Sequence, residues 1–176
     1  NPELAAEVAE KVLLQLDANP TLTTYSLAAN DGWEEGWCEC EACAAVGNAT
    51  DQLLLFANRV AAIVSEKYPH VLFSILSYHN NYFPPENVTA HPNVEVMFCT
   101  ETSVTSPIED GLYLGDTRNP ITHNTYKTSW KDNFLSYIKK ANLQNISIWK
   151  WLCISGDSSS SAWANIPWVQ GDVAIR

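Results

Sequence analysis

Polar side chains able to do acid–base chemistry follow four apolar, β-type segments of the chain. The four segments are residues 23–29, 71–77, 94–99 and 146–152. Asp31, His79 and Glu101 come just after the first three, and Lys150 lies in the fourth. In parallel α/β proteins the carboxyl ends of the strands hold the reactive site. We therefore expect these four side chains to converge on one site at the carboxyl ends of the strands.

Two carboxylates, Asp31 and Glu101, are the expected catalytic pair. Paired carboxylates across a sugar supply a general acid together with a nucleophile or base. For Asp31 a structural reading stays open, because Asn30-Asp31-Gly32 is also a strong turn signal. Glu101 stands among Thr and Ser after an apolar strand, where a capping role is less obvious. Glu101 is accordingly the expected general acid.

Aromatic and amide side chains beside these groups predict a carbohydrate subsite, because ligand sites combine apolar surface with a few placed polar groups. The expected substrate-binding residues are Tyr78, His79, Asn80, Trp149, Lys150 and Trp151, with Asn81 and Tyr82 behind the first three. Structural readings compete: His79 as a hydrogen-bonding residue, and each Trp as core. Lys150 would be costly to bury unpaired. It either faces a polar mouth, pairs with Asp31 or Glu101, or forms a strand-end salt bridge without function.

Cys38, Cys40 and Cys43 form a C-x-C-x2-C cluster. Three thiols within six residues suit a soft metal such as zinc, and Cys99, His79 or a residue outside the chain could complete the ligand set. A local disulfide with one odd thiol, or three free thiols, are the alternatives. A catalytic zinc site would be expected to contain His. We therefore expect a structural zinc, if any, and no cofactor for the chemistry itself.

Composition excludes several classes of function. The 176 residues carry a net charge of −10, with 17% charged and 11% aromatic residues. Nucleic acids and anionic membranes both require a basic footprint, so neither is an expected partner. No apolar stretch is long enough to insert across a bilayer. The sequence also has no glycine-rich phosphate loop, nucleophile elbow or H-E-x-x-H motif.

Hydrophobic periodicity predicts the elements that carry these residues. The expected helices cover residues 3–17, 50–68, 126–142 and 168–176, and a long loop covers residues 100–125. Thr50 or Asp51 is the expected cap of the second helix. Alternating helices and strands predict one α/β domain over residues 1–176 with a mainly parallel sheet. Because helices stand at both ends, we expect about half of a TIM-like (β/α)8 barrel, a fragment of a larger protein. A self-contained open sheet is the alternative.

The stretch from Tyr25 to Gly32, followed by the cysteine cluster, resembles the bacterial family called domain of unknown function 4838. The similarity continues through Tyr68-Pro69, Pro84-Pro85 and the strand ending at Cys99-Thr100-Glu101. It implies a glycoside-hydrolase-like barrel, similar to hexosaminidase and α-glucuronidase barrels, in large and usually exported proteins. The matching site positions are Asp31, Glu101 and the three cysteines. The loop after Glu101 departs from the family pattern.

Together these observations predict a carbohydrate-active domain acting on glycosidic bonds, with a carbohydrate and the remainder of the parent protein as partners. The resemblance implies an extracellular or periplasmic location. Two alternatives from other classes remain open. One is a noncatalytic carbohydrate-binding domain, and the other is a zinc-stabilised interaction domain.

Overall fold

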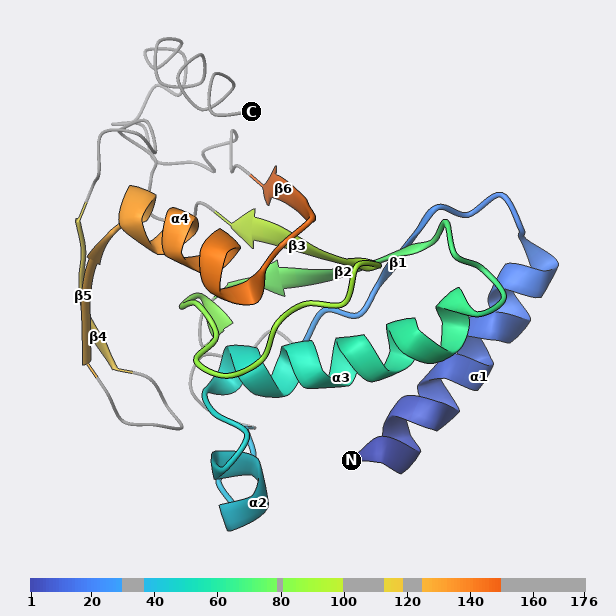
Figure 1. The fold of residues 1–176 in the computed structure, drawn as a ribbon, viewed down its shortest axis with the longest axis horizontal. Helices are drawn as coiled ribbons and strands as arrows, with labels where there is room; N and C mark the ends of the chain where they lie inside the picture. The colour runs from blue at the N-terminus through green and yellow to red at the C-terminus, as the bar shows by residue number, and fades with distance from the viewer. Residues whose placement is uncertain (30–36, 79–80, 100–112, 119–124, 150–176) are drawn as a thin grey trace, which may run out of the picture.

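The computed structural model describes residues 1–29, 37–78, 81–99, 113–118 and 125–149 (Figure 1). These residues form four helices and six strands. The helices are α1 (Pro2–Ala18), α2 (Glu41–Ala44), α3 (Ala49–Ser65) and α4 (Trp130–Ala141). The strands are β1 (Thr24–Ser26), β2 (Leu72–Ser77), β3 (Val94–Cys99), β4 (Tyr113–Arg118), β5 (Thr125–Ser129) and β6 (Asn145–Trp149).

Four of the strands form one parallel sheet in the order β1-β2-β3-β6. Sequence order and spatial order agree, because each strand lies beside the previous member of the sheet. Figure 1 shows the arrowheads of β2, β3 and β6 pointing to the same side of the molecule. The predicted parallel α/β sheet is therefore confirmed.

The main helices cover one face of this sheet. The register places Phe73, Val94 and Ile146 on a common face. Buried residues of α1, α3 and α4 belong to the same hydrophobic cluster as Phe73 and Val94. A doubly wound sheet reverses its strand order and carries helices on both faces. A single winding direction with helices on one face is the arrangement of a partial barrel. Over the described residues this sheet is open, with β1 and β6 at its edges.

Helix α3 begins through a capping box. The side chain of Asn48 accepts a hydrogen bond from the Asp51 N–H at 3.1 Å, and Asp51 accepts one from the Asn48 N–H at 2.9 Å. Both residues are fully buried. The prediction that Thr50 or Asp51 is the cap was wrong, since the cap is Asn48 and Asp51 is its reciprocal partner.

The segment before α4 also differs from the prediction. Residues 126–129, expected to start a helix, belong instead to strand β5, which pairs antiparallel with β4 in the expected loop. Cross-strand pairing therefore overrides the helical period of the first four residues of the expected helix. Helix α4 starts at Trp130 and keeps its buried residues Phe134 and Tyr137. The expected helix at residues 168–176 lies outside the described residues.

Among the described residues, none of the helices combines the length and the apolar character needed to cross a bilayer.

Candidate functional site

The carboxyl ends of β2, β3 and β6 lie level with one another at one edge of the sheet. Ser77 pairs with Phe98, which pairs with Ile148, and Cys99 pairs with Trp149. Tyr78, one residue beyond Ser77, therefore stands at the level of the last pair. In the sequence, the predicted polar clusters follow the ends of β2 and β3 directly and begin at Trp149 in β6. Three residues separate the end of β1 at Ser26 from Asn30. The predicted catalytic residues Asp31 and Glu101, and the predicted ligand-binding residues His79, Asn80, Lys150 and Trp151, lie outside the described residues.

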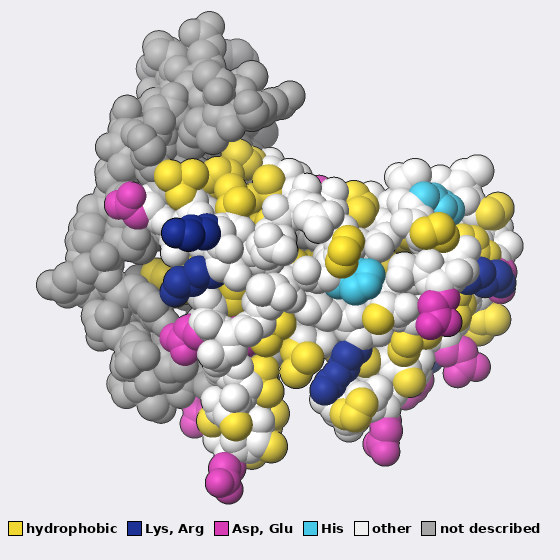
Figure 2. Space-filling model, viewed as in Figure 1, with side chains coloured by type: hydrophobic (Ala, Val, Ile, Leu, Met, Phe, Trp, Pro, Cys, Tyr) yellow, Lys and Arg dark blue, Asp and Glu magenta, His cyan; other side chains and the backbone are white. Residues whose placement is uncertain are grey.

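The described members of the predicted subsite divide into two groups. Trp149 is 52% exposed and Tyr78 is half-buried, so both present surface near the edge. Figure 2 shows hydrophobic side chains gathered over α4 and β6 on the visible face. Asn81 and Tyr82 are buried instead, at 5% and 8% exposure. These two residues pack inside the domain rather than facing a ligand.

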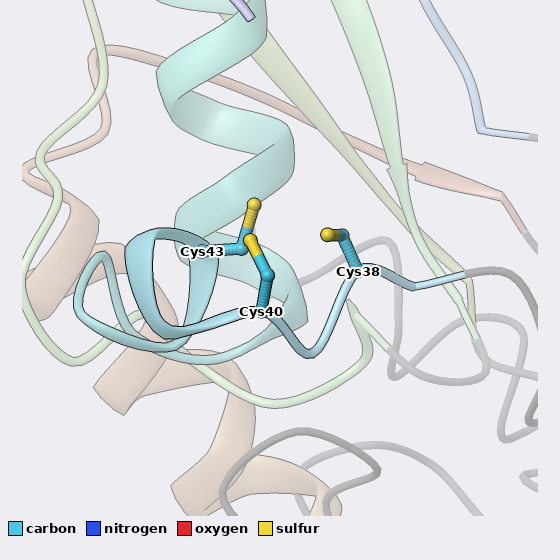
Figure 3. Close-up of side chains that lie close together, drawn as sticks. All are labelled: Cys38, Cys40 and Cys43. Atoms are coloured by element: carbon cyan, nitrogen blue, oxygen red, sulfur yellow. The ribbon is translucent and has the colours of Figure 1, made fainter.

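Three cysteine side chains meet in the connection between β1 and α3. The sulfurs of Cys38, Cys40 and Cys43 all lie within 4.8 Å of one another. Figure 3 shows the sulfurs of Cys40 and Cys43 pointing the same way and that of Cys38 turned toward them. Cys38 and Cys40 are exposed, and all three are free thiols. This cluster could therefore bind a metal ion.

Hydrogen bonds inside the cluster set its protonation. The pKa of Cys40 is lowered, first by a hydrogen bond from the backbone N–H of Cys43 and then by the neighbouring thiols. Hydrogen bonds to Cys38 and Cys40 raise the pKa of Cys43 to about 11. One sulfur therefore loses its proton first and the adjacent thiols stabilise it. Thiolate is the form that binds metals.

Cys99, a proposed fourth ligand in the sequence, does not belong to this cluster. It is buried at the end of β3. Within the described part of the chain, the three clustered cysteines are the only group of three or more His, Cys, Asp or Glu side chains arranged to hold a metal. The predicted trio is thus brought together, and the suggested contribution of Cys99 was wrong.

Helix α3 holds the cysteine motif from one side. The side-chain amide nitrogen of Gln52 donates to the carbonyl oxygen of Cys38 at 3.2 Å and to that of Cys43 at 3.3 Å. The short helix α2 begins at Glu41, with Cys40 as its cap residue. Figure 1 shows α2 beside the start of α3. Gln52 therefore joins the first and last cysteines of the motif to the first turn of α3.

The same turn of α3 also anchors the connection between β2 and β3. The Asp51 carboxylate accepts hydrogen bonds from the backbone N–H groups of Glu86, Asn87 and Val88 at 2.7–2.9 Å. Thr50 donates to the carbonyl oxygens of Asn81 and Phe83 through its hydroxyl. A fully buried carboxylate is compensated here by backbone donors.

Helix α4 also contacts the connection between β2 and β3. Tyr137 of α4 is fully buried, and burial raises the pKa of its phenol. Asn133, also on α4, donates to the carbonyl oxygen of Tyr82 at 3.0 Å. The connection between β2 and β3 is therefore packed between two helices.

Sequence reasoning missed the roles of Gly47, Asp51 and Gln52. The spacing Asn48-x-x-Asp51 resembles a capping box and could have located the start of α3. Gly47 adopts a φ of +134°, and a Cβ there would lie 2.3 Å from a carboxylate oxygen of Asp51. No local signal indicates the contact between Gln52 and the cysteine motif, because its acceptors lie 9 and 14 residues away.

Fold and site together define a singly wound parallel α/β domain with a three-thiol cluster in its first β–α connection. The chain belongs to the family described as Domain of unknown function (DUF4838), whose model matches residues 1–152. The resemblance drawn from the cysteine motif is thereby confirmed. Comparisons with curated proteins and with solved structures found no match.

Proposed function

We propose that this protein is a carbohydrate-active domain that hydrolyses glycosidic bonds at the carboxyl edge of its parallel sheet. One observation carries the proposal: the strand register aligns the carboxyl ends of β2, β3 and β6 at one edge, where Trp149 is 52% exposed. An exposed indole next to convergent polar segments suits a neutral, polar ligand with apolar faces, such as a sugar. The exported location belongs to the same proposal and rests on the family resemblance.

In this mechanism Glu101 protonates the leaving glycosidic oxygen, while Asp31 serves as nucleophile or base on the opposite face of the sugar. Tyr78, His79 and Asn80 would supply hydrogen bonds, and Trp149 and Trp151 would stack on the ring. Lys150 would orient a carboxylate or a polar group of the substrate. The strand topology supports this assignment because all the segments involved leave the sheet at the same side.

The proposal is tested by Glu101→Gln in the protein, assayed on a panel of glycosides and polysaccharides. Loss of general acid catalysis should lower kcat by about 10²–10⁴-fold. The matched control is Glu10→Gln, because Glu10 is exposed on α1, away from the sheet edge, and this change should leave the rate intact. An unchanged rate in Glu101→Gln removes this residue from the mechanism. Glycan binding by calorimetry, with no hydrolysis of any substrate, would favour the noncatalytic binding domain.

We also infer that the three cysteines hold a structural zinc ion. Thiolate ligands, in a cluster that contains no His among the residues the structure describes, support zinc in a structural role, since catalytic zinc sites keep an open position and commonly use His. Elemental analysis of purified protein should find about one zinc per chain, and Cys40→Ser should lose it. Protein without bound metal, and with no change in melting temperature on chelation, would exclude this ion.

A further inference from the structure

We propose that Gln52 is a positioning residue for the cysteine metal centre, and that through Gln52 metal binding stabilises the connection between β2 and β3. This inference rests on the proposed structural metal, and it is independent of the carbohydrate chemistry. The two amide N–H groups of Gln52 bind the carbonyl oxygens of Cys38 and Cys43. They therefore control the separation of the two ends of the motif.

That separation matters because the thiols are near, but not at, the spacing of a bound metal. The three sulfurs lie within 4.8 Å of one another. A tetrahedral zinc with Zn–S bonds of about 2.3 Å would hold its sulfurs about 3.8 Å apart. The cysteines thus need only a small movement to bind. An amide that fixes both outer carbonyls lowers the conformational entropy lost in that movement, as groups that orient metal ligands do.

Metal binding should also affect the connection between β2 and β3, because Asp51, the neighbour of Gln52 in the chain, binds that connection. Asp51 accepts hydrogen bonds from the N–H groups of Glu86, Asn87 and Val88. Asn87 also donates through its side chain to the carbonyl oxygen of Val46 at 3.0 Å, three residues after Cys43. The first turn of α3 therefore contacts both connections. Ordering the cysteine motif should restrict the opening of residues 86–88.

The test compares two variants of α3 that each remove a side-chain amide. Gln52→Met has a similar size but no N–H donor. Asn58→Leu is the matched control, because Asn58 also makes two side-chain bonds to backbone, with Thr89 and His91, away from the thiols. We expect Gln52→Met to weaken zinc affinity by about 10-fold or more, measured by competition with a chelator. Asn58→Leu should leave that affinity unchanged.

Amide hydrogen exchange supplies the second readout. Zinc should slow exchange at Glu86, Asn87 and Val88 in the unaltered protein, and this protection should be reduced in Gln52→Met. Equal zinc affinities in Gln52→Met and the unaltered protein, or an equal loss in Asn58→Leu, would overturn the role of Gln52. If the unaltered protein binds no zinc, both the structural metal and this inference fall, whereas the hydrolysis assay still decides the carbohydrate proposal.

Discussion

Two connections at the same edge of the sheet are held in different ways. In the connection from β2 to β3, residues 81–85 are buried, and side chains of α3 bind backbone groups between residues 81 and 88. The cysteine-bearing part of the connection from β1 to α3 projects from the body of the domain around α2 (Figures 1 and 2). Two of its three thiols are exposed. Gln52 binds two of its carbonyl oxygens, and the Asn87 side chain binds that of Val46.

The difference indicates which interactions hold each connection in its folded conformation. Hydrogen bonds with the buried side chains of Thr50 and Asp51 stabilise the β2–β3 connection without any ligand, because losing one would leave a polar group unsatisfied. The first connection has little buried surface in its cysteine motif, so a metal ion is the simplest source of further stability. One helix, α3, serves both: Asp51 faces the second connection and Gln52 the first.

The largest expected effect comes from removing the buried carboxylate. Asp51→Ala leaves the N–H groups of Asn48, Glu86, Asn87 and Val88 without their acceptor. We expect the free energy of unfolding to fall by about 3 kcal/mol, because one buried donor and three part-buried donors lose their acceptor, and a fully buried unsatisfied donor costs about 1–3 kcal/mol. Urea unfolding measures the change. A loss below that of a surface control such as Glu10→Gln would contradict the anchoring role.

Gly47→Ala should have the next largest effect. Gly47 has φ of +134°, and an added Cβ would approach the Asp51 carboxylate oxygen to 2.3 Å. Backbone strain of this kind costs about 1–3 kcal/mol, and the displaced carboxylate adds to it. The same unfolding assay applies, and exchange at residues 86–88 should accelerate. Wild-type exchange in this variant would mean that the carboxylate can shift without losing its donors.

Removing the metal should lower the stability that depends on the cysteine motif and leave the hydrogen bonds of the β2–β3 connection in place. Without zinc, Cys40→Ser should change the free energy of unfolding by less than about 0.5 kcal/mol, because Cys40 is exposed. With zinc at 100 times its Kd, the unaltered protein should gain about 2.7 kcal/mol and Cys40→Ser much less. Thermal unfolding with and without a chelator measures both. Equal responses of the two proteins to zinc would show that the stabilising ion binds elsewhere.

Asp17→Asn should have the smallest effect on the free energy of unfolding, and it shows how much an exposed ion pair contributes. Hydrogen bonds from Lys67 and then Tyr68 lower the pKa of Asp17, and the side chains of Asp17 and Lys67 are exposed. A carboxylate with a lowered folded-state pKa contributes stability above its unfolded pKa of about 4, and loses it as the pH falls through the folded value. The variant should therefore be slightly less stable at pH 7 and indistinguishable in strong acid. A constant difference at every pH would point to a packing effect instead.

Much of the architecture could be predicted because its signals are local. The apolar period of residues 3–17 predicts α1, and the apolar runs predict β2 and β3 within one residue. The spacing of Cys38, Cys40 and Cys43 alone brings three thiols together. The hairpin β4–β5 was missed, since residues 125–129 become a strand through pairing with β4 rather than through a period of their own.

The sequence by itself determined the parallel α/β class, the family and the cysteine trio, because alternation and close spacing are properties of neighbouring residues. Tertiary structure decided which polar groups are partners. Asp51 meets donors 35 to 37 residues away, Gln52 binds the ends of the cysteine motif, and Cys99 stays outside the cluster. Burial is the physical reason: it makes an unpaired polar group costly, and only the packed arrangement of distant segments determines which partner is within reach.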